Sequence, residues 1–230
     1  MKQESVKIKS SDKIKRKMVK AILEKEFPIG SNLPSERELA VEFGVGRPTI
    51  REALQQLIRD GWIKGNKGLP ATVNDFWQTG NLTTLEHIIE HHDSVPDEFV
   101  VYLLEVRASL SPSYVKDAIM HNQPKAVALL AYLDQLIDEA ESYAHFDWQL
   151  QKGLVRLSPN PVYLLILNSF NSFYLGMAKQ YFSEEQHRIT SRQYYNELLQ
   201  AALKGESEKA GELARRTMVE SINLWKNRKF

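Results

Sequence analysis

The chain has 230 residues, of which 43% are hydrophobic and 26% charged, and its formal net charge is +1. It contains no cysteine, which excludes disulfides, thiolate metal sites and cysteine nucleophiles and is typical of a reducing cytosol. No apolar run approaches the roughly 18 residues of a membrane span, and the charged first residues lack the apolar segment of a signal peptide. We therefore expect a cytoplasmic protein with no membrane partner.

The two parts of the chain differ in charge. Residues 1–77 carry 15 Lys and Arg against 10 Asp and Glu, whereas residues 78–230 carry 15 against 19. This asymmetry predicts two domains with a boundary after residue 77, the basic domain lying near a polyanion. A chance surface composition would give the same split, so the motifs must decide between the two interpretations.

The basic part begins with two predicted helices. Apolar residues at helical spacing predict an amphipathic helix over residues 12–26. Ser35 and Glu38 have the spacing of a capping box, which predicts the start of a second, short helix. Gly44 follows the last apolar residue of that helix, where a glycine commonly ends a helix.

A third helix and a β-hairpin follow. Pro48 suits the first turn of a helix, where its missing N–H costs nothing, and Gly61 ends that helix. Two short β-prone runs, 62–64 and 71–73, flank a glycine-rich turn and predict a hairpin. Helix, helix, tight turn, helix and hairpin is the order of a winged helix-turn-helix.

The start of the third helix carries the residues that suit DNA. Arg47 and Arg51 are four residues apart and share one helix face, and their guanidinium groups suit guanine O6 and N7 or phosphate oxygens. Thr49 adds a hydroxyl and a methyl group. Arg37 can reach the flanking backbone, and Lys67 at the hairpin tip can enter a minor groove or lie along a phosphate. A solvated basic face is the alternative, but the combination of features favours DNA binding.

Residues 78–230 predict helices without alternating strands. The expected spans are 81–92, 96–120, 124–143, 145–157, 161–182, 185–204 and 206–228, separated by proline, asparagine and glycine. The chain is therefore expected to be mainly α. Its winged helix-turn-helix is followed by a C-terminal all-α antiparallel bundle of about seven helices, which can enclose a central cavity.

Two features of this part point to a ligand. Aromatic residues concentrate between Phe170 and Phe182, although core packing alone explains most such stripes. Arg107 lies in an otherwise apolar segment, and a buried arginine needs an anion. The partner of Arg107 is either an internal carboxylate, such as Glu105 or Asp147, or a bound ligand that Arg107 contacts at its phosphate or near its thioester.

The sequence also resembles a known family. The runs LPSERELA (33–40), RPTIREAL (47–54) and DGWI (60–63) resemble the signature of GntR-family transcription factors, and nearly the whole chain is similar to the FadR subfamily. The resemblance implies DNA contacts at Arg37, Gly46, Arg47, Pro48, Thr49, Arg51, Lys67 and Gly68. Gly46 and Pro48 stand where the subfamily has threonines, and Lys67 where it has a histidine, so the operator sequence can differ.

The same resemblance implies the effector and the assembly. It implies a homodimer on a pseudo-palindromic DNA operator that controls fatty-acid genes, with a long-chain acyl-CoA held in the C-terminal domain. The effector contacts that it implies are Leu104, Arg107, Phe170, Tyr174, Tyr181, Tyr195, Met218, Ser221 and Trp225. Met218 replaces a glycine beside the ligand and Gln151 replaces a phenylalanine of the acyl tunnel, which can shift the preferred chain length.

A metal or another cofactor is not expected. Many relatives bind a metal through one aspartate and three histidines. Asp147 matches the aspartate, but the histidine positions fall on Gln151, Asn196 and Thr217, which are poor transition-metal ligands. Two alternatives remain open. The effector can be an organic acid with Arg107 as its clamp, or the chain can be an enzyme acting on CoA esters, although no nucleophile motif is present.

Overall fold

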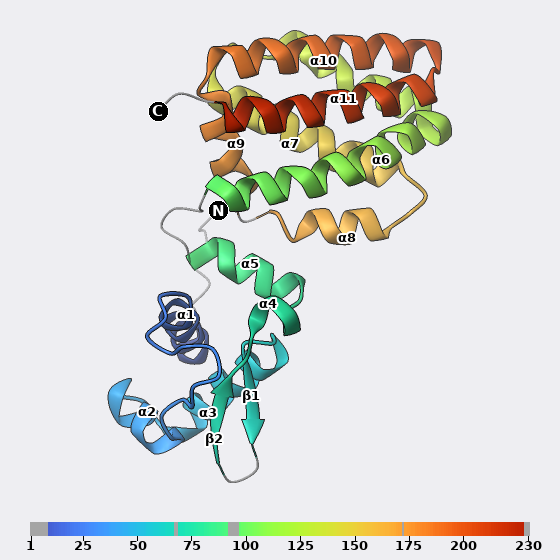
Figure 1. Cartoon of the computed structure of the whole chain (residues 1–230). Helices are drawn as coiled ribbons and strands as arrows, with labels where there is room; N and C mark the ends of the chain where they lie inside the picture. Colours follow the sequence, from blue (N-terminus) through green and yellow to red (C-terminus); the bar gives the residue numbers. More distant parts are fainter. Residues whose placement is uncertain (1–8, 67–68, 92–96, 172, 228–230) are drawn as a thin grey trace, which may run out of the picture. The chain divides into compact units, whose positions relative to one another are not determined.

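The computed structural model describes residues 9–66, 69–91, 97–171 and 173–227. The chain forms two compact units, Met1–Asp93 and Ser94–Phe230, here called the N-terminal and the C-terminal unit. Figure 1 shows that the C-terminal unit is entirely helical over its described residues and that the N-terminal unit adds one hairpin to its helices. Among the described helices, none is both long and apolar enough to cross a membrane.

The N-terminal unit has the predicted order of elements. It consists of α1 (Ser10–Leu23), α2 (Glu36–Glu42), α3 (Arg47–Arg59), β1 (Ile63–Asn66), β2 (Leu69–Val73), α4 (Phe76–Thr79) and α5 (Leu82–His91). The strands pair antiparallel, with Ile63 opposite Val73. This winged helix-turn-helix confirms the fold expected from the sequence.

Local signals determine where these helices begin and end. The capping box of α2 is complete, because Ser35 accepts from the backbone N–H of Glu38 and the Glu38 carboxylate accepts from that of Ser35. Pro48 lies in the first turn of α3, as predicted. Gly44 and Gly61 follow α2 and α3 with φ of +62° and +83°, a conformation that glycine adopts at little cost.

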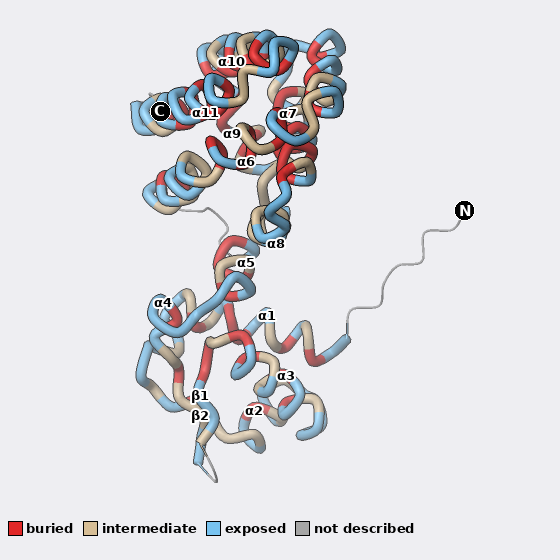
Figure 2. The backbone as a smooth tube through the Cα atoms, turned by 90° about the vertical axis from the view of Figure 1, so that its right-hand side faces the viewer, coloured by how far each residue is buried: buried red, intermediate tan, exposed pale blue. Residues whose placement is uncertain are grey.

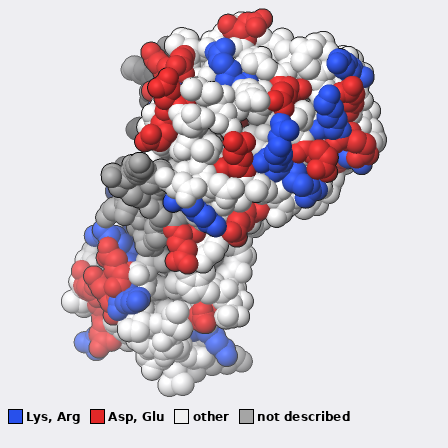
Figure 3. All heavy atoms as spheres, turned by 45° about the horizontal axis from the view of Figure 1, so that its top comes forward, with Lys and Arg blue, Asp and Glu red and all other residues white. Residues whose placement is uncertain are grey.

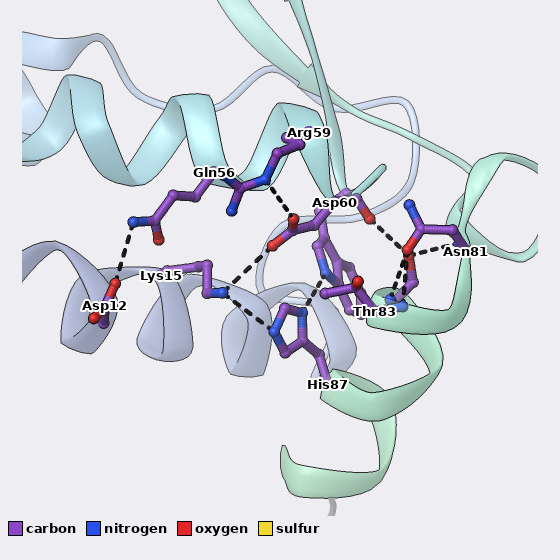
Figure 4. Close-up of polar contacts among 10 residues, drawn as sticks. Asp12, Lys15, Gln56, Arg59, Asp60, Asn81, Thr83 and His87 are labelled. Atoms are coloured by element: carbon purple, nitrogen blue, oxygen red, sulfur yellow. Dashed lines mark hydrogen bonds and ion pairs between the residues drawn. The ribbon is translucent and has the colours of Figure 1, made fainter. Parts of the chain in front are cut away.

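A buried polar cluster joins α5 to the rest of the N-terminal unit. Figure 4 shows the Lys15 Nζ of α1 between Asp60 and His87, at 3.4 Å from Asp60 Oδ2 and 3.2 Å from His87 Nε2. Trp62 Nε1 donates to His87 Nδ1, and Thr84 Oγ1 donates to the Asp60 carbonyl. These bonds hold α5 in the N-terminal unit, and the predicted domain boundary after residue 77 stays a prediction.

The C-terminal unit contains α6 (Asp97–Ala131), a 3₁₀ helix η1 (Tyr132–Gln135), α7 (Ala140–Leu157), α8 (Val162–Asn168), α9 (Tyr174–Phe182), α10 (Glu185–Lys204) and α11 (Ser207–Lys226). Helices α6, α7, α10 and α11 pack around a shared core that includes Val115, Leu130, Leu154, Leu198 and Ala214. Figure 2 shows the buried faces of these helices turned toward one another, with exposed residues outside. Acidic and basic side chains are interspersed on the face of this unit that Figure 3 shows.

The expected break between the helices 96–120 and 124–143 is confirmed, because α6 is interrupted at Asn122, whose φ of −145° and ψ of 45° are not helical and whose side-chain amide donates to the Leu157 carbonyl. Two other expectations for this unit are wrong. The helix that resumes after Asn122 ends at Ala131 rather than at residue 143. Pro124 lies just after the kink, where the helix resumes and its missing N–H is not needed. Helix α7 begins at Ala140 rather than at residue 145, because the turn containing η1 precedes it.

The second error concerns the aromatic segment. A single helix over 161–182 was expected, but α8 ends at Asn168 and α9 begins at Tyr174. Asn168, Ser169 and Asn171 favour turns over helix interiors, because their side chains compete for backbone hydrogen bonds. Phe170 and Phe173 therefore project from a break between two helices.

Candidate functional site

The first candidate site is the start of α3 with the neighbouring α2. Arg47, Pro48 and Arg51 are exposed and Thr49 is half-buried, while Gly46 is the exposed N-cap of the helix. Arg37 is exposed on α2. These residues lie together at one helix-turn-helix, in the geometry that presents a recognition helix. Lys67 and Gly68 lie outside the described residues.

Arg51 has a partner that the sequence did not reveal. Its Nε and Nη2 atoms donate to the two carboxylate oxygens of Glu36 on α2, at 3.1 and 2.8 Å. This hydrogen bond, opposed by desolvation, lowers the pKa of Glu36. Both side chains are exposed, so the pair adds little stability, but it orients the guanidinium and leaves Nη1 and one N–H of Nη2 for another acceptor. Glu36 belongs to the run that contains the capping box, but only the fold shows that it faces Arg51.

The second candidate site is a cavity in the C-terminal unit. It holds about 950 Å³ of space between protein atoms, part of it open to solvent, among the first half of α6, the segment α8–α9 and the end of α11. Apolar and aromatic side chains line most of its wall: Val100, Leu103, Leu104, Val106, Leu110, Tyr163, Leu167, Phe170, Phe173, Met177, Ala178, Phe182 and Trp225. Such a wall suits a long apolar ligand.

Seven of the nine predicted effector residues line this cavity, namely Leu104, Arg107, Phe170, Tyr174, Tyr181, Ser221 and Trp225. The other two, Tyr195 and Met218, are buried in the adjoining core and are not part of the wall. Gln151 lines the cavity as well, together with Tyr114, which the sequence did not single out. The ligand contacts of all these residues stay predictions.

The polar part of the wall is organised around Asp147. Arg107 Nη2 donates to both Asp147 carboxylate oxygens, at 3.0 and 2.7 Å, and the carboxylate is 2% exposed. The hydroxyls of Tyr174 and Tyr195 donate to the same carboxylate. Of the anions considered for Arg107, the structure therefore selects Asp147. Tyr195 thus contacts this cluster from the buried core next to the cavity, without lining the cavity itself.

Gln151 extends the cluster. Its amide nitrogen donates to Asp147 at 3.2 Å, and its amide oxygen accepts from the Tyr114 hydroxyl at 2.6 Å. The amide is thus used on both sides within the protein. Gln151 therefore makes the wall locally polar. It presents no charge to the cavity, and both its amide nitrogen and its amide oxygen are hydrogen-bonded within the protein.

Electrostatics keep the Arg107 guanidinium and the tyrosine hydroxyls of this cluster protonated. Burial raises the pKa of the Tyr114, Tyr174 and Tyr195 hydroxyls well above the usual tyrosine value, while the charge of Arg107 lowers and that of Asp147 raises these pKa values by smaller amounts. Burial is the largest single effect and by itself would lower the pKa of Arg107, but the Asp147 carboxylate and the surrounding tyrosines together outweigh it, and the net shift is upward. The guanidinium is therefore charged, and its charge is balanced inside the protein.

Two hydrogen-bond donors in the cavity wall are unused. Arg107 Nε is buried and has no partner among the described residues. The Tyr181 hydroxyl has no partner in full hydrogen-bond geometry among the described residues, although an interaction with the Ser221 side chain lowers its pKa. Burial is the larger effect and raises the pKa of Tyr181 to about 12. Unpaired buried donors are costly, so these two favour a ligand that carries an acceptor.

The arrangement around Asp147 does not suit a metal ion. The Arg107 guanidinium already pairs with the Asp147 carboxylate. Asn196 is exposed, and its side-chain N–H donates to the Arg192 carbonyl. No group of three or more His, Cys, Asp or Glu side chains that could hold a metal occurs among the described residues. The expected absence of a metal stays a prediction.

The chain is similar to known bacterial regulators over most of its length. Residues 10–73 match the family "Bacterial regulatory proteins, gntR family" and residues 74–230 match the "FadR C-terminal domain". The chain is 40% identical over 210 residues to the fatty acid metabolism regulator protein of Shewanella pealeana, covering 91% of this chain and 88% of that protein. The protein of the same name from Haemophilus influenzae is 36% identical over 209 residues, covering 91% and 87%.

A solved structure supports the fold. The structure titled "Lar controls the expression of the Listeria monocytogenes agr system and mediates virulence" aligns with a TM-score of 0.62 at 17% identity, covering 96% of this chain and 99% of that one. At this identity the similarity shows the fold alone. The two family matches and the curated relatives establish that the chain belongs to the GntR family of bacterial regulatory proteins and carries a FadR-type C-terminal domain.

Proposed function

We propose that this protein regulates transcription of fatty-acid metabolism genes as a homodimer that binds a DNA operator in the cytoplasm and releases it when a long-chain acyl-CoA binds. The relatives named fatty acid metabolism regulator support the regulated pathway. In this proposal residues 1–77 supply DNA binding and residues 78–230 bind the effector and regulate. Each domain then contains one of the two candidate sites.

The balanced charge of Arg107 is the observation that carries the proposal. An arginine that clamps an organic acid must offer its charge to the ligand, but here Asp147 already compensates that charge at 2.7 Å. A second carboxylate would enter beside Asp147 and be repelled. The donors that remain include the Arg107 Nε–H and the Tyr181 hydroxyl, in a wall that is mostly apolar. These donors suit a neutral acceptor such as a thioester carbonyl, with the acyl chain along the apolar residues.

The DNA side of the proposal rests on α2 and α3. Arg37, Gly46, Arg47, Pro48, Thr49 and Arg51, with Lys67 and Gly68 from the hairpin turn, would contact the operator. We expect the effector to bind more tightly to a conformation of the dimer in which the two recognition helices are not positioned for the operator, and this preference would weaken DNA binding. By linkage, DNA would weaken effector binding by the same factor.

An enzymatic role is not part of the proposal. The Asp147 carboxylate accepts hydrogen bonds from Arg107, Tyr174, Tyr195 and Gln151, so it has little capacity left to act as a base. The tyrosines that surround it are held protonated by burial, which makes them poor nucleophiles. Incubation with an acyl-CoA tests this point, because the thioester should remain intact.

Calorimetric titration tests the effector. We expect heat from long-chain members of a series from octanoyl-CoA to oleoyl-CoA, and none from free CoA, oleate or citrate. Tyr181→Phe removes one unused donor without opening a cavity and should weaken acyl-CoA binding about tenfold. Tyr132→Phe, at a 61% exposed site, is the matched control and should bind like the wild type.

Two outcomes would contradict the proposal. Heat from citrate without heat from any thioester would identify an organic acid as the effector. Equal binding of oleate and oleoyl-CoA would show that the balanced charge of Arg107 does not exclude carboxylates.

A further inference from the structure

A buried histidine that is not in the cavity wall contacts the wall from behind. His187 lies in the first turn of α10 and is 4% exposed. Its ring stacks on Tyr181, with centroids 4.3 Å apart and planes inclined by 22°. Trp225 lies nearly parallel to the same tyrosine, at 6.3 Å and 18°. Phe182 meets the same ring edge-on at 5.1 Å. Of these three aromatic neighbours, Phe182 and Trp225 line the cavity and His187 does not.

His187 also holds the backbone of Tyr181. Its Nδ1 lies 2.6 Å from the Tyr181 carbonyl oxygen. A carbonyl can only accept, so Nδ1 carries the proton and donates. This bond fixes the tautomer of His187 and ties its imidazole to both the ring and the main chain of one residue.

The bond belongs to a cap at the end of α9. The last carbonyls of a helix have no partner within it, and no glycine ends α9. Side chains supply the donors instead. Ser183 Oγ donates to the Gln180 carbonyl, His187 to that of Tyr181, and Arg188 Nη1 to those of Phe182 and Ser183, at 2.8 and 3.1 Å. Arg188 is itself anchored to Asp138 by an ion pair of 2.8 Å.

This cap positions much of the cavity wall. Helix α9 supplies Tyr174, Met177, Ala178, Tyr181 and Phe182 to the wall. It is a helix of nine residues between the 169–173 break and the start of α10. Figure 1 shows its end directly before α10. The position of the Tyr181 hydroxyl therefore depends on how α10 holds that end.

We propose that His187 is a positioning residue for the effector, which acts by holding Tyr181 so that its hydroxyl can donate to the bound ligand. This inference rests on the proposed function, because Tyr181 matters here only as a ligand contact. It adds a residue outside the cavity wall that determines effector affinity without touching the effector.

Two substitutions separate the donor from the ring. His187→Phe keeps an aromatic ring against Tyr181 but removes the N–H, whereas His187→Gln offers an amide N–H without a ring. We expect His187→Phe to weaken oleoyl-CoA binding about fivefold to tenfold and His187→Gln to restore most of the affinity. His145→Phe is the control, since His145 lies at an exposed position of α7 and pairs with the exposed Glu141.

A double-mutant cycle distinguishes positioning from a general structural role. If His187 acts through the Tyr181 hydroxyl, His187→Phe should cause almost no further loss of oleoyl-CoA affinity in a Tyr181→Phe background. If it only stabilises the fold, the two losses should multiply. Operator binding without effector should be unchanged in every variant. Should His187→Phe fail to fold, His187→Gln takes its place in the cycle.

The possible results distinguish a failure of the proposed role of His187 from a failure of the proposed function. Wild-type protein that binds oleoyl-CoA, with multiplicative losses in the cycle or full affinity in His187→Phe, overturns the role of His187 and leaves the proposed function intact. Wild-type protein that binds no acyl-CoA overturns the proposed function, and the role of His187 with it.

Discussion

Asp147→Asn tests how the polar wall of the cavity is held together. The substitution keeps the size of the side chain and removes its charge. Asp147 accepts from Arg107, Tyr174, Tyr195 and Gln151, so the change leaves a guanidinium without a counterion. The new amide also brings N–H donors to a position where other donors converge.

The expected cost follows from the burial of the pair. Removing one partner of a buried ion pair typically costs about 3–5 kcal/mol, because the other charge stays desolvated. The side chain of Arg107 is 21% exposed, which favours the lower end of that range. For a unit of this size, about 3 kcal/mol lowers the melting temperature by roughly 10 °C.

Thermal unfolding followed by circular dichroism measures this change. Glu141→Gln is a matched control on the same helix, since Glu141 pairs with Lys179 at 2.7 Å on the surface and its loss should leave the melting temperature unchanged. Asp147→Asn combined with Arg107→Met should recover part of the loss, because no buried charge is then left unpaired. A double variant as unstable as Asp147→Asn alone would refute the argument from uncompensated charge.

Three further predictions concern DNA binding, alkaline stability and backbone conformation. Arg51→Ala should cost about 1–3 kcal/mol of discrimination between operator and scrambled DNA, measured by fluorescence anisotropy, and unchanged discrimination would remove Arg51 from the recognition surface. The pKa of Tyr181 is raised by burial from 10.0 to about 12, so unfolded phenols lose their protons first. Stability should be intact below pH 10 and fall as pH rises toward 12, and a phenolate absorbance near pH 10 that Tyr181→Phe removes from the folded protein would contradict this. Gly61→Ala should lower the melting temperature more than Gly44→Ala. Both positions have positive φ, but only at Gly61 would a Cβ lie 2.9 Å from a backbone oxygen, and equal losses would show that the contact is relieved.

Sequence reasoning succeeded where the determining interactions are local. The capping box of Ser35 and Glu38 spans one helical turn, and the conformations of Gly44 and Gly61 depend on their own backbone. Pro48 is compatible with only the first turn of a helix. Such signals act within a few residues, so the order of elements in the N-terminal unit can be predicted without the rest of the fold.

The same reasoning was less reliable in the C-terminal unit. The break that Pro124 predicts is present at Asn122, but the helix expected to reach residue 143 ends at Ala131, and the chain passes through η1 before α7 begins at Ala140. The break between α8 and α9 has turn-forming residues in the sequence. The apolar periodicity of the flanking segments masks them, because it is compatible with one continuous helix.

The sequence by itself determined the family, the kind of fold and the residue types of both candidate sites. Only the tertiary structure decided how those residues are used. Arg107 had several possible carboxylate partners, and Asp147, 40 positions away, is chosen because α6 and α7 pack side by side. Arg51 meets Glu36, and His187 meets the carbonyl of Tyr181, through the packing of separate helices. An ion pair or a cap between helices depends on distances that no local pattern encodes, so it is known only once the chain has folded.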